Sequence, residues 1–88
     1  MNAPTVVRIL YFAWVREMIG TAEEEASLDA PMTLEALAEM LRGRSAGHAR
    51  AFADLSRLRV AVNQDFTRWS HLIVPGDEVA IFPPVTGG

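Results

Sequence analysis

The two segments richest in β-branched and aromatic residues lie near opposite ends of the chain, at residues 5–13 and 78–82. Each alternates in the manner of a strand with one buried face. Between them, Thr33 is a suitable N-cap for a helix whose apolar residues recur at helical spacing: Leu34, Leu37, Ala38 and Leu41. Two distant strands and one amphipathic helix restrict the chain to an α+β fold in which the helix packs across a sheet.

Shorter elements fill the rest of the chain. Before the main helix we expect a helical turn at residues 14–19 ending at Gly20 and an edge strand within 21–29, and we expect the main helix to end at Gly43 or Gly47. After it we expect a short helix at 49–55, a strand at 58–62, a turn at 63–65 and an extended piece within 69–74. Pro75-Gly76 suits a type II turn. This order matches the β-grasp, or ubiquitin-like, arrangement, in which the first and last strands lie side by side and parallel.

Parallel pairing of the terminal strands predicts which of their residues share a face. The odd-numbered residues suit the core: Val7, Ile9, Tyr11, Val79 and Ile81. The even-numbered residues then form three pairs on the outer face: Arg8 with Glu78, Leu10 with Ala80, and Phe12 with Phe82. The last two pairs make an exposed apolar patch beside the C-terminal tail, and such patches mark partner interfaces. The alternative is that the helical turn at 14–19, or the residues around Trp69, cover this patch.

Composition excludes several classes of function. At 88 residues the chain has room for one domain, and it contains no cysteine, hence no disulfide, thiolate metal site or thiol nucleophile. Its formal charge of −3 argues against binding nucleic acid. No apolar stretch approaches the roughly 20 residues of a membrane span, and the N-terminus lacks the pattern of a secretion signal. We therefore expect a soluble, cytoplasmic protein with no nucleic-acid or membrane partner.

The scattered polar residues suggest no active site. We expect His48 and His71 at the surface or in turns, and two histidines without cysteine argue against a zinc site. The run at residues 23–25, three glutamates, is expected to be solvated. The arginines between residues 42 and 59 are also expected to be solvated. For the glutamates and for these arginines, the alternative is a charged docking surface. Trp14 and Trp69 are expected to be packing residues.

The chain ends in two glycines, Gly87 and Gly88, which follow the pair Pro83-Pro84. Two terminal glycines arise by chance in about one chain in 200. The prolines end the last strand and project the last four residues away from the sheet, and glycines without Cβ can enter a narrow channel. We therefore expect residues 1–84 to form the domain and residues 85–88 an extended tail that presents the α-carboxylate of Gly88.

A carboxylate at neutral pH is a poor electrophile and must be activated, most simply by adenylation. The chain has no phosphate-binding loop, thiol or lysine of its own, so another enzyme must consume the ATP. We therefore expect a carrier without an active site and without a stably bound cofactor, loaded by one partner and unloaded by another.

Several motifs together resemble the small subunit of molybdopterin synthase. They comprise the ending Phe82-Pro83-Pro84-Val85-Thr86-Gly87-Gly88, the preceding Pro75-Gly76-Asp77-Glu78-Val79-Ala80, Leu10-Tyr11-Phe12-Ala13 followed by Arg16-Glu17, Ala61-Val62-Asn63-Gln64, and Thr33-Leu34-Glu35-Ala36-Leu37. The resemblance spans the chain, although residues 23–32 and 45–58 carry no family signature.

This resemblance implies a β-grasp fold and a role in molybdenum cofactor biosynthesis. An activating enzyme would adenylate Gly88, the acyl-adenylate would become a thiocarboxylate, and its sulfur would pass to a cyclic pyranopterin phosphate to build the molybdopterin dithiolene. The implied assembly is a heterotetramer of two small and two large subunits. Carried over by position, Gly87 and Gly88 are the reactive tail, and the residues implied in partner binding are Leu10, Phe12, Ala80, Phe82, Pro83, Pro84, Val85 and Thr86.

Three other functions fit the same residues. The chain could carry sulfur for another pathway, such as thiamin, tungsten-cofactor or amino-acid synthesis. It could be a ubiquitin-like modifier that forms amide bonds to targets, or a β-grasp interaction module whose glycine tail is inert. Removal of Gly88 distinguishes the interaction module from the others, because the module would still bind its partner, whereas a carrier or a modifier would lose its function.

Overall fold

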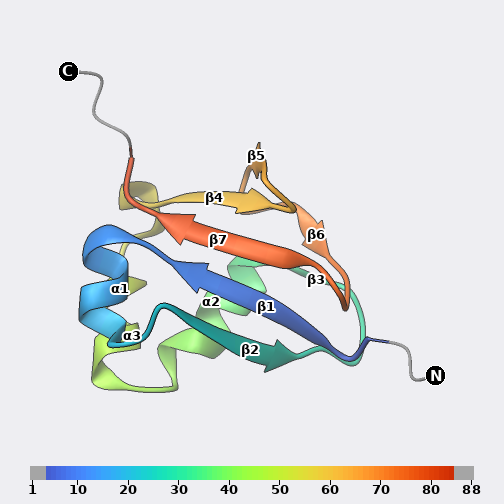
Figure 1. The fold of residues 1–88 in the computed structure, drawn as a ribbon, viewed down its shortest axis with the longest axis horizontal. Helices are drawn as coiled ribbons and strands as arrows, with labels where there is room; N and C mark the ends of the chain where they lie inside the picture. The colour runs from blue at the N-terminus through green and yellow to red at the C-terminus, as the bar shows by residue number, and fades with distance from the viewer. Residues whose placement is uncertain (1–3, 85–88) are drawn as a thin grey trace.

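A computed structural model describes residues 4–84, which form a five-stranded mixed sheet with helices against one face (Figure 1). The predictions for Val85, Thr86, Gly87 and Gly88 lie outside the described residues. The strand order is β2-β1-β7-β4-β5, with the bounds β1 Val6–Tyr11, β2 Glu23–Ser27, β4 Arg59–Val62, β5 Asp65–Thr67 and β7 Glu78–Phe82. Two shorter strands, β3 (Met32–Thr33) and β6 (Leu72–Ile73), pair with each other.

The terminal strands β1 and β7 pair in parallel at the centre of the sheet, and the other neighbouring strands pair antiparallel. The register places Arg8 opposite Glu78 and Leu10 opposite Ala80, as predicted. The α+β prediction is therefore confirmed, with the adjacent parallel terminal strands that a β-grasp fold requires.

The third predicted pair, Phe12 with Phe82, is wrong. The ladder between β1 and β7 ends with Tyr11 opposite Ile81. Ala13 has a positive φ of 54°, so the backbone turns sharply at this point and Phe12 becomes the N-cap of the following helix. Phe12 thus leaves the sheet just before it would have reached Phe82.

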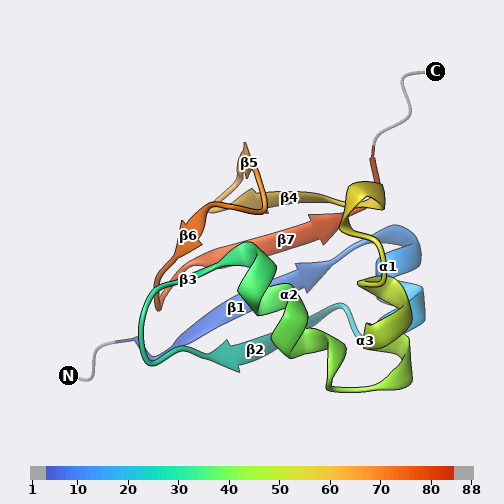
Figure 2. The ribbon, with the colours of Figure 1, turned by 180° about the vertical axis from the view of Figure 1, so that it is seen from behind.

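Three α-helices cover the inner face: the main helix α2 (Leu34–Arg42) and the shorter α1 (Ala13–Ile19) and α3 (Ala46–Ala51), with a 3₁₀ turn η1 (Leu55–Arg57). Figure 2 shows α2 crossing the sheet, with α1 and α3 side by side at the end where β7 finishes. The helix predicted at 49–55 begins earlier because Ser45 caps it, its Oγ accepting from the backbone N–H of His48 at 3.1 Å. No helix among residues 4–84 has the length and apolarity that crossing a bilayer requires.

The predicted core is confirmed. The odd-numbered residues of both terminal strands are at most 1% exposed: Val7, Ile9, Tyr11, Val79 and Ile81. They pack in one cluster with the apolar stripe of α2: Leu34, Leu37, Ala38 and Leu41. Burying each large apolar side chain contributes about 1.5–3 kcal/mol, so the alternation of the strands and the stripe of the helix together determine how the layers stack.

Two glycines expected as possible ends of α2 have different roles. Gly43 is the C-cap of α2, whereas Gly47 lies within α3, where that helix packs against α1. A Cβ on Gly47 would lie 2.1 Å from the carbonyl oxygen of Met18. Only glycine therefore allows the two helices to approach this closely.

Candidate functional site

A row of apolar residues runs from strand to strand across the outer face of the sheet. Leu10 on β1 lies opposite Ala80 on β7, Ala80 opposite Ala61 on β4, and Ala61 opposite Phe66 on β5. We call these four residues the apolar row. Ala61 is only 5% exposed, whereas the Phe66 side chain at the end of the row is 81% exposed. A large exposed aromatic beside a floor of alanines is suited to contact with a partner.

Phe82 lies beside the apolar row, and its ring centroid is 5.8 Å from that of Phe66. Together with Arg59, Val60 and Thr67, the two rings line a hollow of about 270 Å³. Because β7 ends at Phe82, this hollow adjoins the point from which the chain continues toward its C-terminus. The apolar row and the hollow together form what we call the docking face.

The structure leaves every predicted partner-binding residue that it describes at least partly exposed: Leu10, Phe12, Ala80, Phe82, Pro83 and Pro84. Phe12 is 45% exposed, but it stands at the start of α1, outside the apolar row. Trp14 and Trp69 pack against the buried core, as predicted. Leu10, Ala80 and Phe82 stay partly exposed, so neither neighbourhood covers the patch completely.

Phe66 belongs to the docking face, but the prediction from sequence missed it. The expected turn at residues 63–65 left no room for β5, which is only three residues long. A tighter, two-residue turn at Asn63-Gln64 would have paired Phe66 with Ala61 and so placed its side chain on the outer face. The length of the turn therefore decides the placement of Phe66, because a shift of one residue reverses which side chains of a strand face outward.

Charged residues border the apolar row on the side of β1 and β2. The Nε atom of Arg8 donates to Oε2 of Glu23 at 2.8 Å, and its guanidinium lies 3.7 Å from Glu78. The predicted Arg8–Glu78 ion pair is therefore present, but the hydrogen bond and charge of Glu23 are the main causes of the raised pKa of Arg8. Exposed ion pairs of this kind add little stability to the fold, so we interpret them as a polar border of the apolar row.

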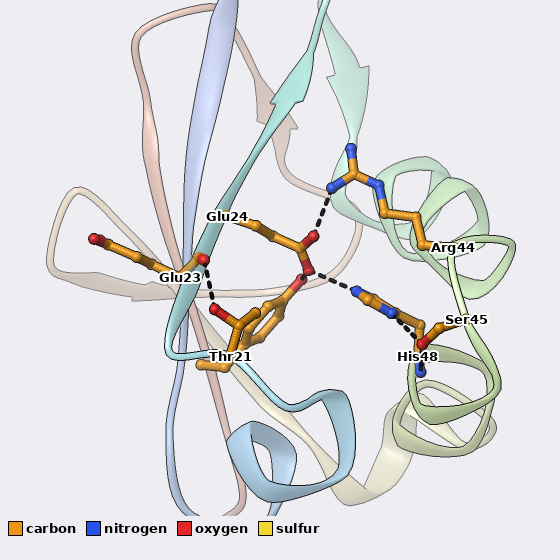
Figure 3. A network of polar contacts seen from close by, with 7 residues as sticks. Thr21, Glu23, Glu24, Arg44, Ser45 and His48 are labelled. Carbon is orange, nitrogen blue, oxygen red and sulfur yellow. Dashed lines mark hydrogen bonds and ion pairs between the residues drawn. The ribbon is translucent and has the colours of Figure 1, made fainter.

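A second polar cluster lies on the helix side, centred on Glu24 (Figure 3). Its Oε2 accepts from the hydroxyl of Tyr11 and faces Nε2 of His48, both at 2.6 Å, while its Oε1 accepts from Arg44 at 2.7 Å. Ser45 Oγ lies 2.7 Å from Nδ1 of His48. This cluster connects β1 and β2 with the start of α3.

Two predictions fail at this cluster. His48 is 7% exposed rather than a surface residue, and Glu24 is partly buried rather than solvated. Arg44 is exposed, as predicted, but its guanidinium also makes an ion pair with Glu24. The reason is the strand geometry: Glu24 lies opposite Ile9, whose side chain points into the core, so Glu24 points toward the helices as well. His71, by contrast, is exposed as predicted.

The cluster shifts the pKa values of its members. Burial alone would raise the pKa of Glu24, but the hydrogen bonds from Tyr11, His48 and Arg44 outweigh it, and the pKa is lowered. Burial and the hydrogen bond to Glu24 raise the pKa of Tyr11. Tyr11 therefore acts as a neutral donor to a charged acceptor. Ser45, which contacts the His48 ring, also caps α3, so the cluster fixes the start of this helix against β1 and β2. We therefore interpret the cluster as structural.

Residues 4–84 contain no group of three or more histidine, aspartate or glutamate side chains placed to hold a metal ion. The features that point to function within this part of the chain are the docking face and the strand that leads from it toward the C-terminus.

Comparison with known proteins finds relatives that match nearly the whole chain. The sulfur carrier subunit of molybdopterin synthase from Escherichia coli (strain K12) is 45% identical over 83 residues, which span 94% of this chain and 100% of the relative. The crystal structure of SAMP1 from Haloferax volcanii superposes with a TM-score of 0.77 at 26% identity, covering 94% of this chain and 99% of that one.

A further structure shares the fold at lower identity. It is the complex of subunits 1 and 2 of the molybdopterin-converting factor from Helicobacter pylori 26695, with a TM-score of 0.64 at 19% identity over 94% of this chain and 99% of that one. The ThiS family profile matches residues 9–88. Matches that cover nearly the whole chain in sequence and in structure show that this protein belongs to the ThiS family, whose fold is ubiquitin-like.

Proposed function

We propose that this chain is the sulfur carrier subunit of a molybdopterin synthase, with sulfur held as a thiocarboxylate on Gly88. The observation that carries the proposal is the 45% identity, over 94% of this chain, to a relative of that name. The docking face supports it, because an apolar surface next to the C-terminal strand is what a carrier needs to present its tail to a partner.

The chemistry begins on a separate activating enzyme. A carboxylate oxygen of Gly88 attacks the α-phosphate of ATP, pyrophosphate leaves, and an acyl-adenylate forms. Sulfur at the oxidation level of sulfide then attacks the acyl carbon and displaces AMP, which leaves the thiocarboxylate. Sulfur is a softer nucleophile than oxygen, so the thiocarboxylate sulfur can attack an electrophilic carbon of a cyclic pyranopterin phosphate and displace an oxygen substituent there. Hydrolysis of the resulting acyl–sulfur bond leaves the sulfur on the pterin and restores the carboxylate for another cycle. This chain contributes the reactive terminus and consumes ATP only through its partner.

The proposed partner at the second step is the large subunit of molybdopterin synthase, in an assembly of two small and two large subunits. The Helicobacter pylori structure, a complex of subunits 1 and 2 of the molybdopterin-converting factor, supports such a partnership. On this chain, the docking face would position the tail, with Leu10, Ala80 and Phe82 in the contact and Phe12 at its edge. Pro83, Pro84, Val85 and Thr86 would lead Gly87 and Gly88 into the partner.

Intact-protein mass spectrometry tests the proposal. The chain is incubated with ATP, the activating enzyme of its own organism and a sulfur donor, beside a chain that lacks Gly88. We expect a mass gain that matches one exchange of oxygen for sulfur, and none in the shortened chain. Addition of the large subunit and cyclic pyranopterin phosphate should then reverse the gain and produce molybdopterin.

Other outcomes decide between the alternatives. A thiocarboxylate that the large subunit does not consume would assign the chain to another sulfur pathway. Covalent adducts with target proteins would indicate a modifier. If no mass gain occurs although the activating enzyme loads a different carrier, the sulfur-carrier function is wrong and an interaction module remains.

A further inference from the structure

We propose that Asn63 is a positioning residue for docking, which holds the β4–β5 hairpin so that Phe66 stands beside Phe82. This inference rests on the proposed function, because it assigns Phe66 to the surface that the large subunit contacts. Asn63 itself would not touch the partner; its effect would pass through the hairpin.

The hairpin has few other restraints. β5 is an edge strand of three residues, and within residues 4–84 its one strand partner is β4. Phe66 at its centre is 81% exposed, so it gains little from burial in the free chain. The direction in which this aromatic points therefore depends strongly on the turn between the two strands.

That turn has an unusual backbone. Asn63 and Gln64 both have positive φ, 51° and 75°, the combination found in two-residue turns that match the twist of a hairpin. Asparagine tolerates this conformation well, whereas glutamine is strained in it. Other contacts must therefore hold the turn, and the structure shows them on Asn63.

The side chain of Asn63 connects the turn with the start of β7. Its Nδ2 donates to Oδ1 of Asp77 at 2.9 Å, and its Oδ1 accepts from the backbone N–H of Glu78 at 3.0 Å. The backbone N–H of Asn63 donates to the carbonyl of Glu78 at 2.8 Å. With one side chain, Asn63 thus bonds both the carboxylate of the turn residue Asp77 and the backbone N–H at the start of β7.

Asp77 is fixed in turn by its own neighbours. Its Oδ2 accepts from the backbone N–H of Val74 at 2.9 Å, and its own N–H donates to the Val74 carbonyl at 3.1 Å, which closes the turn before β7. Its carbonyl accepts from the N–H of Arg8 at 3.1 Å. Asn63 is therefore anchored to a rigid corner of the sheet, and this corner sets the place of the hairpin that carries Phe66.

A double-mutant cycle tests this inference with Asn63→Gly and Phe66→Ala. Glycine preserves the positive φ but removes both side-chain bonds. The dissociation constant for the purified large subunit is measured by calorimetry for the original chain, both single variants and the double variant. We expect Asn63→Gly to weaken binding about three- to tenfold. In the Phe66→Ala background it should change binding by less than about twofold.

Two further variants keep the result interpretable. Asn63→Asp preserves the shape but turns a second carboxylate toward Asp77, so it should weaken binding in the same way as Asn63→Gly. Gln64→Gly relieves the strain next to Asn63 without touching its bonds, so it should raise the melting temperature and leave binding unchanged. NMR contacts between the rings of Phe66 and Phe82 should be lost in the Asn63 variants, while contacts within the core persist.

The outcomes separate the inference from the function on which it rests. If the unaltered chain does not bind the large subunit, the proposed function fails. If it binds but Phe66→Ala has no effect, or if Asn63→Gly costs the same with and without Phe66, the positioning role is overturned and the carrier function stands. If Asn63→Gly has no effect while Phe66→Ala does, the role is overturned as well.

Discussion

The Nε2 atom of His48 lies 2.6 Å from Oε2 of Glu24. Glu24 belongs to the edge strand β2, which precedes the main helix α2 in the sequence, whereas His48 belongs to α3, which follows it. Tyr11 and Arg44 complete the coordination of the same carboxylate. A carboxylate that accepts three hydrogen bonds in a partly buried site favours its ionised form, and its pKa is lowered. The stability of the fold should therefore depend on the charge of this one group.

We expect Glu24→Gln to destabilise the protein by about 1–3 kcal/mol at neutral pH, because it removes the charge from these bonds. A lowered pKa in the folded state stabilises the fold above the ordinary pKa of a glutamate, and this contribution is lost as the pH falls through the folded value. Chemical denaturation between neutral and acidic pH measures the effect.

The difference between the original chain and Glu24→Gln should shrink as the solution becomes acidic. Asp54 also has a lowered pKa, caused by hydrogen bonds from Ser56, and it remains in both proteins, so the difference isolates Glu24. A difference that stays constant down to strong acid would contradict the interpretation.

Tyr11 offers an independent test at alkaline pH. It is the only tyrosine of the chain, so ultraviolet absorbance reports its ionisation alone. Its pKa is raised by burial and by the hydrogen bond to Glu24, so the stability it provides is present below the ordinary tyrosine pKa of 10.0 and is lost as the pH rises above it. We expect phenolate to form only together with unfolding. Phenolate that appears near pH 10 in a folded protein would argue against the buried bond.

Gly47→Ala should destabilise the protein, although alanine is the better helix former. The gain in helix propensity is about 1 kcal/mol, whereas a Cβ 2.1 Å from the carbonyl oxygen of Met18 forces α1 and α3 apart. Because the clash is with backbone, the cost should lie toward the upper end of the about 1–3 kcal/mol typical of overpacking and exceed the propensity gain. Thermal melting measures it, and Gly43→Ala is the matched control.

In that control, the added Cβ meets only the Met40 carbonyl at 3.6 Å, and the backbone φ of −79° suits any residue. Gly43→Ala should therefore melt close to the original chain. Equal melting temperatures for both variants would show that the helices do not pack as described.

Phe82→Ala and Phe66→Ala should each weaken binding to the large subunit by roughly tenfold or more, as expected for aromatic residues at an interface. Phe66→Ala should hardly change the melting temperature, because its side chain is 81% exposed. Leu72→Ala is the control, since Leu72 is 60% exposed but belongs to β6, outside the docking face. Calorimetric titration with the large subunit provides the affinities, and equal losses for Leu72 and Phe66 would argue against a localised face.

The elements that could be predicted are those in which local pattern and tertiary packing agree. Alternation in the terminal strands and the stripe of α2 indicated the inner face, and aligning the strand ends gave the correct opposite partners for Arg8 and Leu10. The type II turn was also predictable, because Gly76 supplies the required positive φ of 97°.

The features that could not be predicted depend on contacts between distant residues or on a shift of one position. Nothing near Glu24 in the sequence indicates that His48 and Arg44 will meet it. The same is true of Gly47, whose need for glycine arises from a backbone carbonyl in another helix. Phe66 was missed because the hairpin turn is one residue shorter than expected, which reverses the faces of β5.

The placement of β7 has a mechanical consequence. This strand is hydrogen bonded to β1 on one side and to β4 on the other, and it runs parallel to β1, so that the start of β1 and the end of β7 lie at opposite ends of the sheet (Figure 1). A force that draws the C-terminus away from the N-terminus therefore loads the bonds between β1 and β7 in shear, so that they must break together rather than in succession. An enzyme that grips the end of this chain pulls on a strand that resists extraction from both sides.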